Sequence, residues 1–331
     1  MSMKLKPLSQ TPSISVILPV LNEQAHLFQS ITSILAQEYL GQFEVILALG
    51  PSTDKTDEIA QSLAARDSRV ILLSNPTGKT AAGLNAAIAR SSNEIIVRVD
   101  GHAELPQDYL ATAVEILRAT GAVNVGGIMG AEGITPFEKA VARAMRSALG
   151  VGSSRFHTGG EAGSVDTVYL GAFRRDALIE AGGFDIRYTR AQDWELNFRL
   201  RKNGGSIYFD PRLHVTYRPR PNIKKLAKQY FEYGRWRRVV SRNHSGTINY
   251  RYLAPPLALV GTVTSLLLGT LISPILFIPA CIYGLFIVAS SIVISHSLRE
   301  FFLLLVIMPT MHFAWGLGFL TSPKTLVPVL K

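Results

Sequence analysis

The stretch Glu94-Ile-Ile-Val-Arg-Val-Asp-Gly-His102 joins a short β-rich run to an acidic turn. A strand that ends here carries Asp100 and His102 to the carboxyl edge of a sheet, where open α/β folds bind their ligands. The Asp-x-His spacing puts both side chains on one side of an extended segment, so both could reach one divalent ion. The alternative is a simple Asp-Gly turn with a solvated histidine. The stretch therefore predicts a sheet edge with a candidate metal site.

Short β-rich runs alternate with helix-like runs on both sides of this stretch. Such alternation is typical of a mostly parallel sheet with helices on both faces. The expected strands are Ile14–Leu18, Phe43–Leu49, Val70–Leu73, Glu94–Val99 and Ala122–Ile128, and the expected helices are Glu23–Gln37, Asp54–Arg66, Thr80–Arg90 and Gln107–Thr120. The predicted fold class is α/β.

The alternation loosens after Thr135. We expect a helix over 136–149, a glycine-rich loop over 150–163 that could order over a ligand, a strand over 167–170, and helices near 175–181 and 192–203. The last helix opens with Gln192-Asp193-Trp194. The Asp193 carboxylate could act as a general base, but an acid in a first helical turn is also favoured by the helix dipole.

Three apolar segments occupy the C-terminal part of the chain: Leu253–Ile272, Pro274–Ile294 and Phe301–Leu320. None contains Lys, Arg, Asp or Glu, and each approaches the ~20 residues that a membrane helix needs. We expect three transmembrane helices. Little more than Ser273-Pro274 separates the first two, so a tight hairpin or a re-entrant pair is an alternative, and a buried helical bundle is another.

The net charge of +10 is concentrated directly before these segments. Residues 212–251 contain eleven Lys or Arg and a single acid, Glu232. This placement fits the positive-inside rule and contact with the anionic lipids of a cytosolic leaflet, so membrane lipids are an expected partner. Nucleic-acid binding is the competing interpretation of a basic patch, but no nucleic-acid motif accompanies it, and we expect no such partner.

The N-terminal part of the chain does not resemble a signal peptide, because the apolar run 14–21 is interrupted by Pro19. The only cysteine, Cys281, lies in the second apolar segment, so no intramolecular disulfide can form. We therefore expect a multi-pass protein of the cytoplasmic (inner) membrane whose large domain lies in the cytosol.

Six short motifs follow one another along the chain: Ile14-Ser-Val-Ile-Leu-Pro-Val-Leu-Asn-Glu23, Pro51-Ser-Thr-Asp54, Ala82-Gly-Leu-Asn85, Val99-Asp-Gly-His102, Gly182-Gly-Phe-Asp185 and Gln192-Asp-Trp-Glu195. In this order they resemble the motifs of the family 2 glycosyltransferases, and the match spans roughly residues 13 to 240. No single motif is specific, but their order is. The chain also resembles membrane-anchored bacterial enzymes of exopolysaccharide assembly, including the succinoglycan-type glucosyltransferases.

The resemblance implies a GT-A fold, a nucleotide-diphosphate sugar donor, a divalent cation and inversion at the anomeric carbon. It makes Asp193 the general base and Asp100 and His102 the metal ligands, with Gln192 and Trp194 toward the acceptor. The residues implied to contact the donor are Pro19, Glu23, Asp54, Asn85 and Asp100. Lys79 is a further candidate from its own sequence: Gly78-Lys-Thr80 fails as a P-loop because Leu73 stands where a glycine is needed, but the lysine could still touch a phosphate. A solvated surface lysine is the alternative.

Two motifs depart from the family pattern. Leu49-Gly-Pro-Ser-Thr-Asp54 stands where relatives commonly have Asp-Asp-Gly-Ser-Thr-Asp, which leaves the nucleobase open, with a UDP-sugar as the first expectation. Asp100-Gly-His102 stands in place of Asp-x-Asp. Because His is a softer ligand than carboxylate, we expect Mn²⁺ to be preferred over Mg²⁺.

The basic region contains Arg235-Trp236 within a helix-like run that starts at Asn222. In processive polysaccharide synthases a Gln-x-x-Arg-Trp motif places its Arg near the diphosphate and its Trp near the acceptor. Position 232 is Glu here, so the match is partial. A basic amphipathic anchor at the lipid headgroups is the alternative, and both roles can hold together.

These features predict a GT-A domain over 1–220, a basic amphipathic interfacial region over 221–251 and a membrane domain over 252–331. The expected function is metal-dependent, inverting transfer of a sugar to a lipid-linked glycan acceptor at the cytosolic membrane face, in exopolysaccharide or cell-wall glycan assembly. Transfer directly to polyprenyl phosphate is the close alternative. A non-catalytic membrane sensor or scaffold for sugar nucleotides is the alternative from another class.

Overall fold

The computed structural model describes residue 3 and residues 5–327, and these form two compact units. The first unit contains the described residues up to Gly130 together with Gly159–Tyr217. The second contains Ala131–Thr158 and the described residues from Arg218 onward. The chain thus leaves the first unit at residue 131, returns to it at residue 159 and leaves it again after Tyr217. The division predicted from the sequence, into 1–220, 221–251 and 252–331, did not separate residues 131–158 from the first unit.

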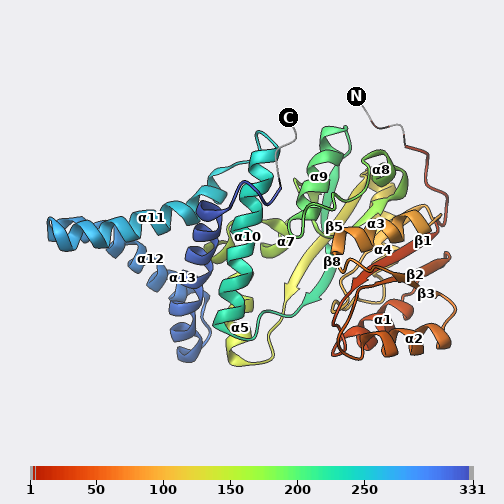
Figure 1. The fold of residues 1–331 in the computed structure, drawn as a ribbon, viewed down its shortest axis with the longest axis horizontal. Helices are drawn as coiled ribbons and strands as arrows, with labels where there is room; N and C mark the ends of the chain where they lie inside the picture. The colour runs from red at the N-terminus through yellow and green to blue at the C-terminus, as the bar shows by residue number, and fades with distance from the viewer. Residues whose placement is uncertain (1–2, 4, 328–331) are drawn as a thin grey trace. The chain divides into compact units, whose positions relative to one another are not determined.

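The first unit is built on one mixed sheet of eight strands in the order β3-β2-β1-β4-β7-β5-β8-β6 (Figure 1). The pairs β1–β2, β1–β4 and β2–β3 are parallel, and β7 runs antiparallel to β4 and β5. The carboxyl ends of β1, β2 and β4 therefore meet at one edge. The strands are β1 (Ile14–Val20), β2 (Phe43–Leu49), β3 (Val70–Ser74), β4 (Ile95–Arg98), β5 (Asn124–Ala131), β6 (Gly163–Ser164), β7 (Tyr169–Arg174) and β8 (Ile207–Tyr217).

Helices cover both faces of this sheet, and each face has its own apolar core. In β1, Val16 and Leu18 point to one core while Ile17 points to the other, since successive side chains of a strand face opposite ways. Helices α1 (Leu27–Leu35), α2 (Thr56–Arg66) and α4 (Tyr109–Thr120) pack in the first core, and α3 (Thr80–Arg90), α8 (Arg175–Glu180) and α9 (Gln192–Lys202) in the second. The predicted α/β class is confirmed.

Several segments differ from the sequence-based expectation. Strand β8 was not predicted, because Pro211 and the ion-paired residues Asp210 and Arg212 interrupt its apolar pattern. The glycine-rich stretch 150–163, expected to be a loop, contains the short helix α7 (Arg155–Thr158). The helix expected over 136–149 is divided into two, over Pro136–Met145 and Ala148–Val151, and the two-residue strand β6 was not expected. Strand β2 and helix α3 have the predicted bounds.

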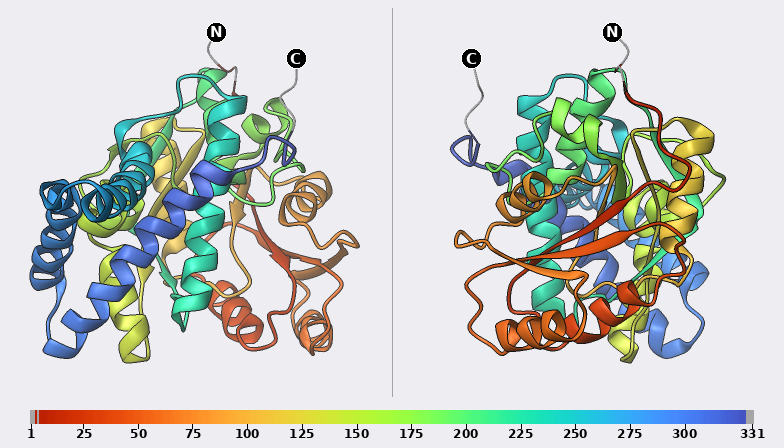
Figure 2. Two further views of the ribbon diagram at one scale, coloured as in Figure 1. Left: turned by 60° about the vertical axis from the view of Figure 1, so that its left-hand side comes forward. Right: turned by 90° about the vertical axis from the view of Figure 1, so that its right-hand side faces the viewer.

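The second unit is helical and includes three helices long and apolar enough to cross a membrane: α11, η1 with α12, and α13. Helices α10 and α13 are in contact, and in the left view of Figure 2 the blue α13 runs obliquely to the blue-green α10. Asn222 caps α10 by accepting a hydrogen bond from the backbone N–H of Lys225. The elements are α5 (Pro136–Met145), α6 (Ala148–Val151), α7, α10 (Ile223–Asn243), α11 (Tyr250–Leu271), η1 (Pro274–Phe277), α12 (Ile278–Ile294) and α13 (Leu298–Thr321).

Two glycines allow α10 and α13 to approach closely. A Cβ atom at Gly234 of α10 would overlap the carbonyl oxygen of Trp315, and one at Gly318 of α13 would overlap that of Phe231. Small residues of this kind let helix backbones come into contact, as they do in membrane proteins. The close packing of these two helices thus depends on both glycines.

Candidate active site

The loops after β1 and β2 are joined by a network of short hydrogen bonds. The backbone N–H of Thr53 donates to Oδ1 of Asn22 at 2.8 Å, and the backbone N–H of Glu23 donates to Oγ1 of Thr56 at 2.8 Å. Asn22 has φ +56°, the left-handed region that Asn tolerates better than most residues. The network fixes the backbone of Glu23 beside the end of β2, and Pro19 lies within β1 opposite Ala48.

Asp54 anchors this network. Its carboxylate accepts hydrogen bonds from the backbone N–H and the hydroxyl of Thr56 and from the backbone N–H of Gln24. The hydroxyl of Thr56 is the main cause that holds the pKa of Asp54 below its usual range. Asp54 therefore stays ionised at the exposed sheet edge.

Arg98, the last residue of β4, brings together two carboxylates that are far apart in the sequence. Its Nη2 lies 3.0 Å from Oδ1 of Asp100, and its Nη1 is paired with Oδ1 of Asp193 at the start of α9. The Arg98 side chain is 6% exposed, whereas those of Asp100 and Asp193 are 24% and 28% exposed. One buried cation thus holds both acids at an accessible edge.

The surroundings shift the pKa values of these two carboxyls in opposite directions. Burial, the largest influence on both, raises their pKa values. At Asp100 the charges of Arg98 and His102 oppose burial, and the pKa is held below its usual range. At Asp193 the charge of Asp100 adds to burial, and the pKa is raised despite Arg98. Asp100 is therefore suited to hold a cation and Asp193 to accept a proton.

His102 is oriented by Glu23, since its Nδ1 lies 2.9 Å from Oε1 of that residue. Gly101 allows this approach, because a Cβ there would lie 3.0 Å from Cγ of Glu23. No group of three or more His, Cys, Asp or Glu placed to hold a metal occurs within the described part of the chain. A carboxylate and an imidazole two residues apart nevertheless fit a divalent ion that takes its other ligands from phosphates and water.

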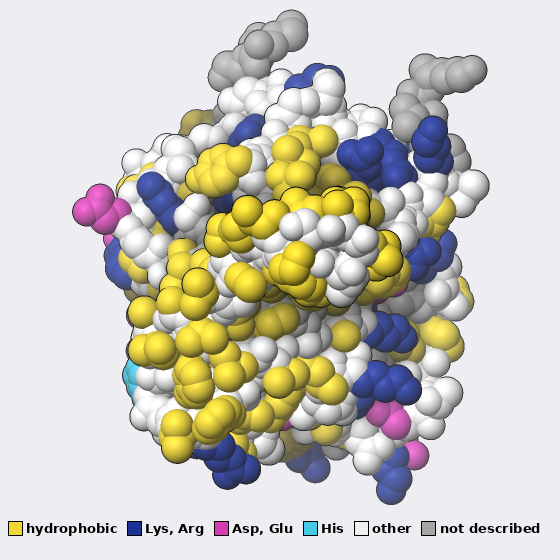
Figure 3. All heavy atoms as spheres, turned by 90° about the vertical axis from the view of Figure 1, so that its left-hand side faces the viewer, with side chains coloured by type: hydrophobic (Ala, Val, Ile, Leu, Met, Phe, Trp, Pro, Cys, Tyr) yellow, Lys and Arg dark blue, Asp and Glu magenta, His cyan; other side chains and the backbone are white. Residues whose placement is uncertain are grey.

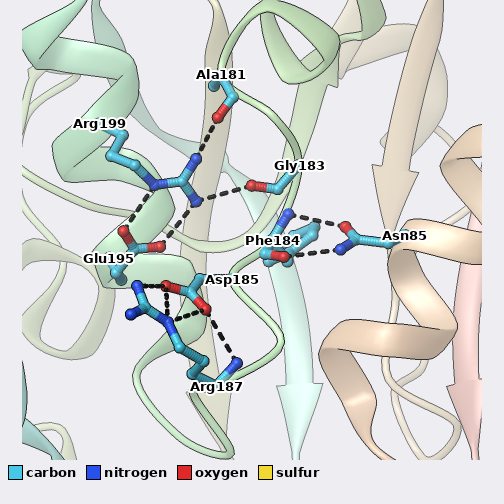
Figure 4. Close-up of polar contacts among 8 residues, drawn as sticks. All are labelled: Asn85, Ala181, Gly183, Phe184, Asp185, Arg187, Glu195 and Arg199. Carbon is cyan, nitrogen blue, oxygen red and sulfur yellow. Dashed lines mark hydrogen bonds and ion pairs between the residues drawn. The ribbon is translucent and has the colours of Figure 1, made fainter. Parts of the chain in front are cut away.

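Asn85 has a role that the sequence did not predict. Its Oδ1 accepts from the backbone N–H of Phe184 at 2.8 Å, and its Nδ2 donates to the carbonyl oxygen of Phe184 at 2.7 Å (Figure 4). These bonds use both polar ends of the amide that was expected to contact the donor. They support the adjacent Gly183, which has φ +69°.

Arg199 of α9 supports the same loop from the other side. It is paired with Glu195 one turn earlier, and it donates to the carbonyl oxygens of Ala181 and Gly183 (Figure 4). Asp185 further along the loop is paired with Arg187 at 2.6 Å. The loop before α9 is therefore held at several points, which fixes the start of the helix that carries Asp193.

The remaining predicted residues lie in different settings. Gln192 is buried, and the ring of Trp194 stacks on that of Phe198 with centroids 5.9 Å apart. Lys79 is exposed at the N-cap of α3.

Arg235 and Trp236 belong to the second unit. Both are bonded to Glu232, at 3.1 Å from Arg235 Nη1 to Oε1 and 3.1 Å from Trp236 Nε1 to Oε2. The glutamate that weakened the motif match thus orients both side chains of the motif.

Sequence reasoning missed Arg98, which joins the two predicted acids. A signal was present, because an arginine inside a short apolar strand is rarely buried unless it is paired. Its partner could not be named from sequence, since ninety-five residues separate Arg98 from Asp193.

Comparisons with known proteins identify the family of this chain. Residues 15–182 match the family described as Glycosyl transferase family 2. The succinoglycan biosynthesis protein ExoA of Rhizobium meliloti (strain 1021) is 31% identical, covering 94% of this chain and 95% of that protein. The dolichyl N-acetyl-alpha-D-glucosaminyl phosphate 3-beta-D-2,3-diacetamido-2,3-dideoxy-beta-D-glucuronosyltransferase of Methanococcus voltae is 26% identical, covering 73% of this chain and 77% of that protein.

Solved structures show the same fold. The mannosyltransferase PcManGT from Pyrobaculum calidifontis, in complex with GDP-Man and Mn²⁺, has a TM-score of 0.68 at 19% identity and covers 96% of this chain and 89% of that one. S. aureus TarS 1-349 in complex with UDP has a TM-score of 0.52 at 16% identity, covering 91% and 90%. These likenesses confirm the predicted GT-A fold. Since the family match covers half of the chain and the likeness to ExoA nearly all of it, this chain belongs to glycosyl transferase family 2.

Proposed function

We propose that this protein is an inverting glycosyltransferase that moves a sugar from a nucleotide-diphosphate donor to a lipid-linked glycan acceptor at the cytosolic face of the cytoplasmic membrane. The observation that carries the proposal is the bonding of Arg98 to both Asp100 and Asp193. It puts a residue suited to metal and diphosphate beside one suited to general base catalysis.

The donor binds at the shared edge of β1, β2 and β4. Asp100 and His102 would hold a divalent cation, and Mn²⁺ would be preferred over Mg²⁺ because of the imidazole ligand. When bound, the cation neutralises the charge that grows on the leaving nucleoside diphosphate. Glu23 orients His102, and Asp54 keeps the neighbouring loop in place.

Asp193 acts on the acceptor. As the acceptor hydroxyl oxygen forms a bond to the anomeric carbon, the bond from that carbon to the diphosphate oxygen breaks, and the hydroxyl proton passes to Asp193. A carboxylate is too weak a base to remove this proton in advance, so proton transfer accompanies attack. Arg98 keeps one carboxylate oxygen of Asp193 engaged and thereby orients the other.

A lipid-linked acceptor is supported by two kinds of observation. The chain has three helices long and apolar enough to cross a membrane, and an enzyme tethered there gains effective concentration toward an acceptor in the same bilayer. The name of the Methanococcus voltae relative gives a dolichyl-linked sugar phosphate as its acceptor, and that of ExoA gives succinoglycan biosynthesis. Exopolysaccharide assembly follows as the preferred role, with cell-wall glycan assembly next.

The donor is proposed to be a UDP-sugar. Solved structures of similar fold contain UDP in one case and GDP-Man in another, so a donor panel must include both nucleotides. The test measures release of the nucleoside diphosphate by membranes that contain the wild type or Asp193→Asn, with Mn²⁺, the donor panel and native lipid extract. Release from one donor that is lost in the variant supports the proposal and identifies the sugar. Equal release by both proteins from every donor contradicts it and favours a sensor or scaffold.

Analysis of the labelled lipid product separates the close alternative. Transfer directly to polyprenyl phosphate yields a lipid phosphomonosaccharide, whereas extension of a lipid-linked glycan yields a longer oligosaccharide after mild acid release. The two products differ in the size of the released sugar.

A further inference from the structure

Helix α13 is bonded to polar helices of the second unit at both of its ends. At its start, Oε2 of Glu300 lies 2.9 Å from Nε of Arg143 on α5. At its end, Arg242 of α10 donates to the carbonyl oxygens of Ser322 and Pro323, and the Ser322 hydroxyl donates to the carbonyl oxygen of Arg235. Residues 300 and 322 lie about 33 Å apart along a helix, close to the ~30 Å of a hydrocarbon core. If α13 crossed the membrane, the bonds at its start and the bonds at its end would therefore have to lie at opposite membrane faces.

The starts of the two attached segments are joined to each other. Nη1 of Arg218, which precedes α10, lies 3.6 Å from Oε2 of Glu132, which precedes α5, and donates to the carbonyl oxygen of Glu132 at 3.3 Å. Helix α5 therefore begins beside the start of α10 and bonds Glu300 near its own end. Because α10 packs on α13 through Gly234 and Gly318, a crossing α13 would carry α10 into the bilayer with it.

The composition of α10 excludes such a crossing. Its 21 residues include seven Lys or Arg and one Glu. Each basic residue near the middle of a membrane helix costs about 3 kcal/mol. The glycine contacts with α13 also require α13 to stay against this polar helix. Both helices therefore lie on the same side of the hydrocarbon core.

The exposed face of α13 fits an interfacial position. Its exposed large apolar side chains fall within an arc of about 100° at 3.6 residues per turn, while the opposite face is buried. The exposed side chains stand near the two ends of α13, over 298–306 and 317–320, whereas no side chain is exposed over 307–316. The two ends are the parts that an in-plane helix would present to a leaflet. The exposed side chains of this arc, the apolar stripe of α13, are Leu298, Phe302, Val306, Leu317 and Leu320.

The hairpin of α11 and α12 is different. In Figure 1, α11 extends away from α10 and α13, and Figure 3 looks onto this side, where hydrophobic side chains gather and Lys and Arg lie at the margins. In the most apolar stretch of each helix, 17% of the residues are buried in α11 and 22% in η1 with α12, against 39% in α13. Its turn is apolar, since Leu271 and Ile272 are 78% and 70% exposed. The hairpin is the part of the unit built to enter the bilayer.

We propose that α10 and α13 lie in the plane of one membrane interface and that only the α11–α12 hairpin enters the bilayer. The partner of this surface is an anionic leaflet, whose headgroups face the exposed Lys224, Lys225 and Lys228 and whose acyl chains cover the apolar stripe of α13. This rests on the membrane location in the proposed function, and it replaces three spans by a two-helix hairpin.

The first test compares the two ends of α13. Single cysteines replace the exposed Arg299 or Lys324 in the full chain carrying Cys281→Ser, and Gln61→Cys on α2 marks the side of the first unit. Sealed vesicles of one orientation are treated with a membrane-impermeant maleimide. We expect Arg299→Cys and Lys324→Cys to label from the same side as each other. Labelling from opposite sides overturns the proposal.

The second test measures depth. A fluorophore is attached to single cysteines at Phe302, Val306, Leu317 or Leu320, with Leu267 of α11 as the hairpin reference, and is quenched by lipids with shallow or deep nitroxides. Uniform shallow quenching along α13 with deep quenching at 267 supports the proposal. A depth that increases toward the middle of α13 and decreases again contradicts it. Neither test needs sugar transfer, so an inactive protein labelled from one side would overturn only the proposed function.

Discussion

The guanidinium of Arg98 bonds the carboxylate of Asp193, ninety-five residues further along the chain, while its other nitrogen bonds Asp100 two residues away. The arginine is almost fully buried, and the two acids are partly exposed. A buried cation shared by two acids fixes their separation more firmly than either backbone segment could alone. The geometry of the proposed reaction thus depends on a residue outside both acidic motifs.

Replacing Arg98 should impair turnover more than donor binding. In Arg98→Gln the Asp193 carboxylate loses its orienting partner, and we expect kcat to fall about 100-fold, since a displacement near 1 Å has that effect. Arg98→Lys keeps the charge but cannot bond the two carboxylates through two separate nitrogens, and it should retain intermediate activity. Steady-state kinetics with donor and acceptor varied separately measure this. A wild-type kcat in Arg98→Gln, in protein that melts normally, would show that the pairing does not position the base.

The metal preference should follow His102. The wild type is expected to be inactive with EDTA and more active with Mn²⁺ than with Mg²⁺. His102→Asp restores the commoner pair of carboxylates, so its activity ratio should shift toward Mg²⁺. Metal titrations of both proteins at saturating donor test this. If the ratio is the same in both proteins, His102 does not bind the metal, and its contact with Glu23 is structural only.

Asn85 should matter for stability. Asn85→Ala leaves the backbone N–H and carbonyl of Phe184 without these partners, a loss of about 1–3 kcal/mol. Asn85→Asp keeps the acceptor for the N–H and should be less destabilised. Melting temperatures of the detergent-solubilised full chain rank the three proteins. An unchanged melting temperature together with a raised KM for the donor would instead support the donor contact first expected from sequence.

Close packing of α10 on α13 should be sensitive to a single methyl group. Gly234→Ala forces the two backbones apart at Trp315 and should lower the melting temperature of the full chain. Gly284→Ala on α12 is the matched control, because nothing lies within 4 Å of its Cβ position. Alanine favours a helix over glycine by about 0.5–1 kcal/mol, so the control should be neutral or more stable. Equal melting temperatures for both variants would mean that the contact is not maintained.

Most of the fold of the first unit could be predicted from local patterns. Strand β2 and helix α3 appear at the predicted bounds, because each has a continuous apolar or helical composition ended by clear turn residues. Strand β8 could not be predicted, since Pro211 and the ion pair of Asp210 with Arg212 interrupt the alternation of apolar and polar residues that is typical of a strand. The excursion of 131–158 into the second unit depends on long-range contacts such as Arg143 with Glu300, which no local pattern reveals.

The site was predicted in part. The order of the motifs indicated which acidic residues belong to the candidate site, and in the structure Asp100 and Asp193 are both bonded to Arg98. The roles of Asn85 and Glu232 were not visible, because both depend on partners fixed by tertiary structure or by rotamer. Polar residues in motifs can bond the backbone or the ligand, and sequence alone does not separate the two uses.

The most direct test of the central claim is transfer of a labelled sugar from the identified donor into extractable lipid, comparing the wild type with Asp193→Asn at equal membrane content. Asn keeps the size of the side chain and can still contact Arg98, but it cannot accept the proton. We expect the variant to bind donor and metal like the wild type, to melt at a similar temperature and to transfer at least 100-fold more slowly, in line with the loss of a general base. Transfer by Asp193→Asn at the wild-type rate would contradict the account.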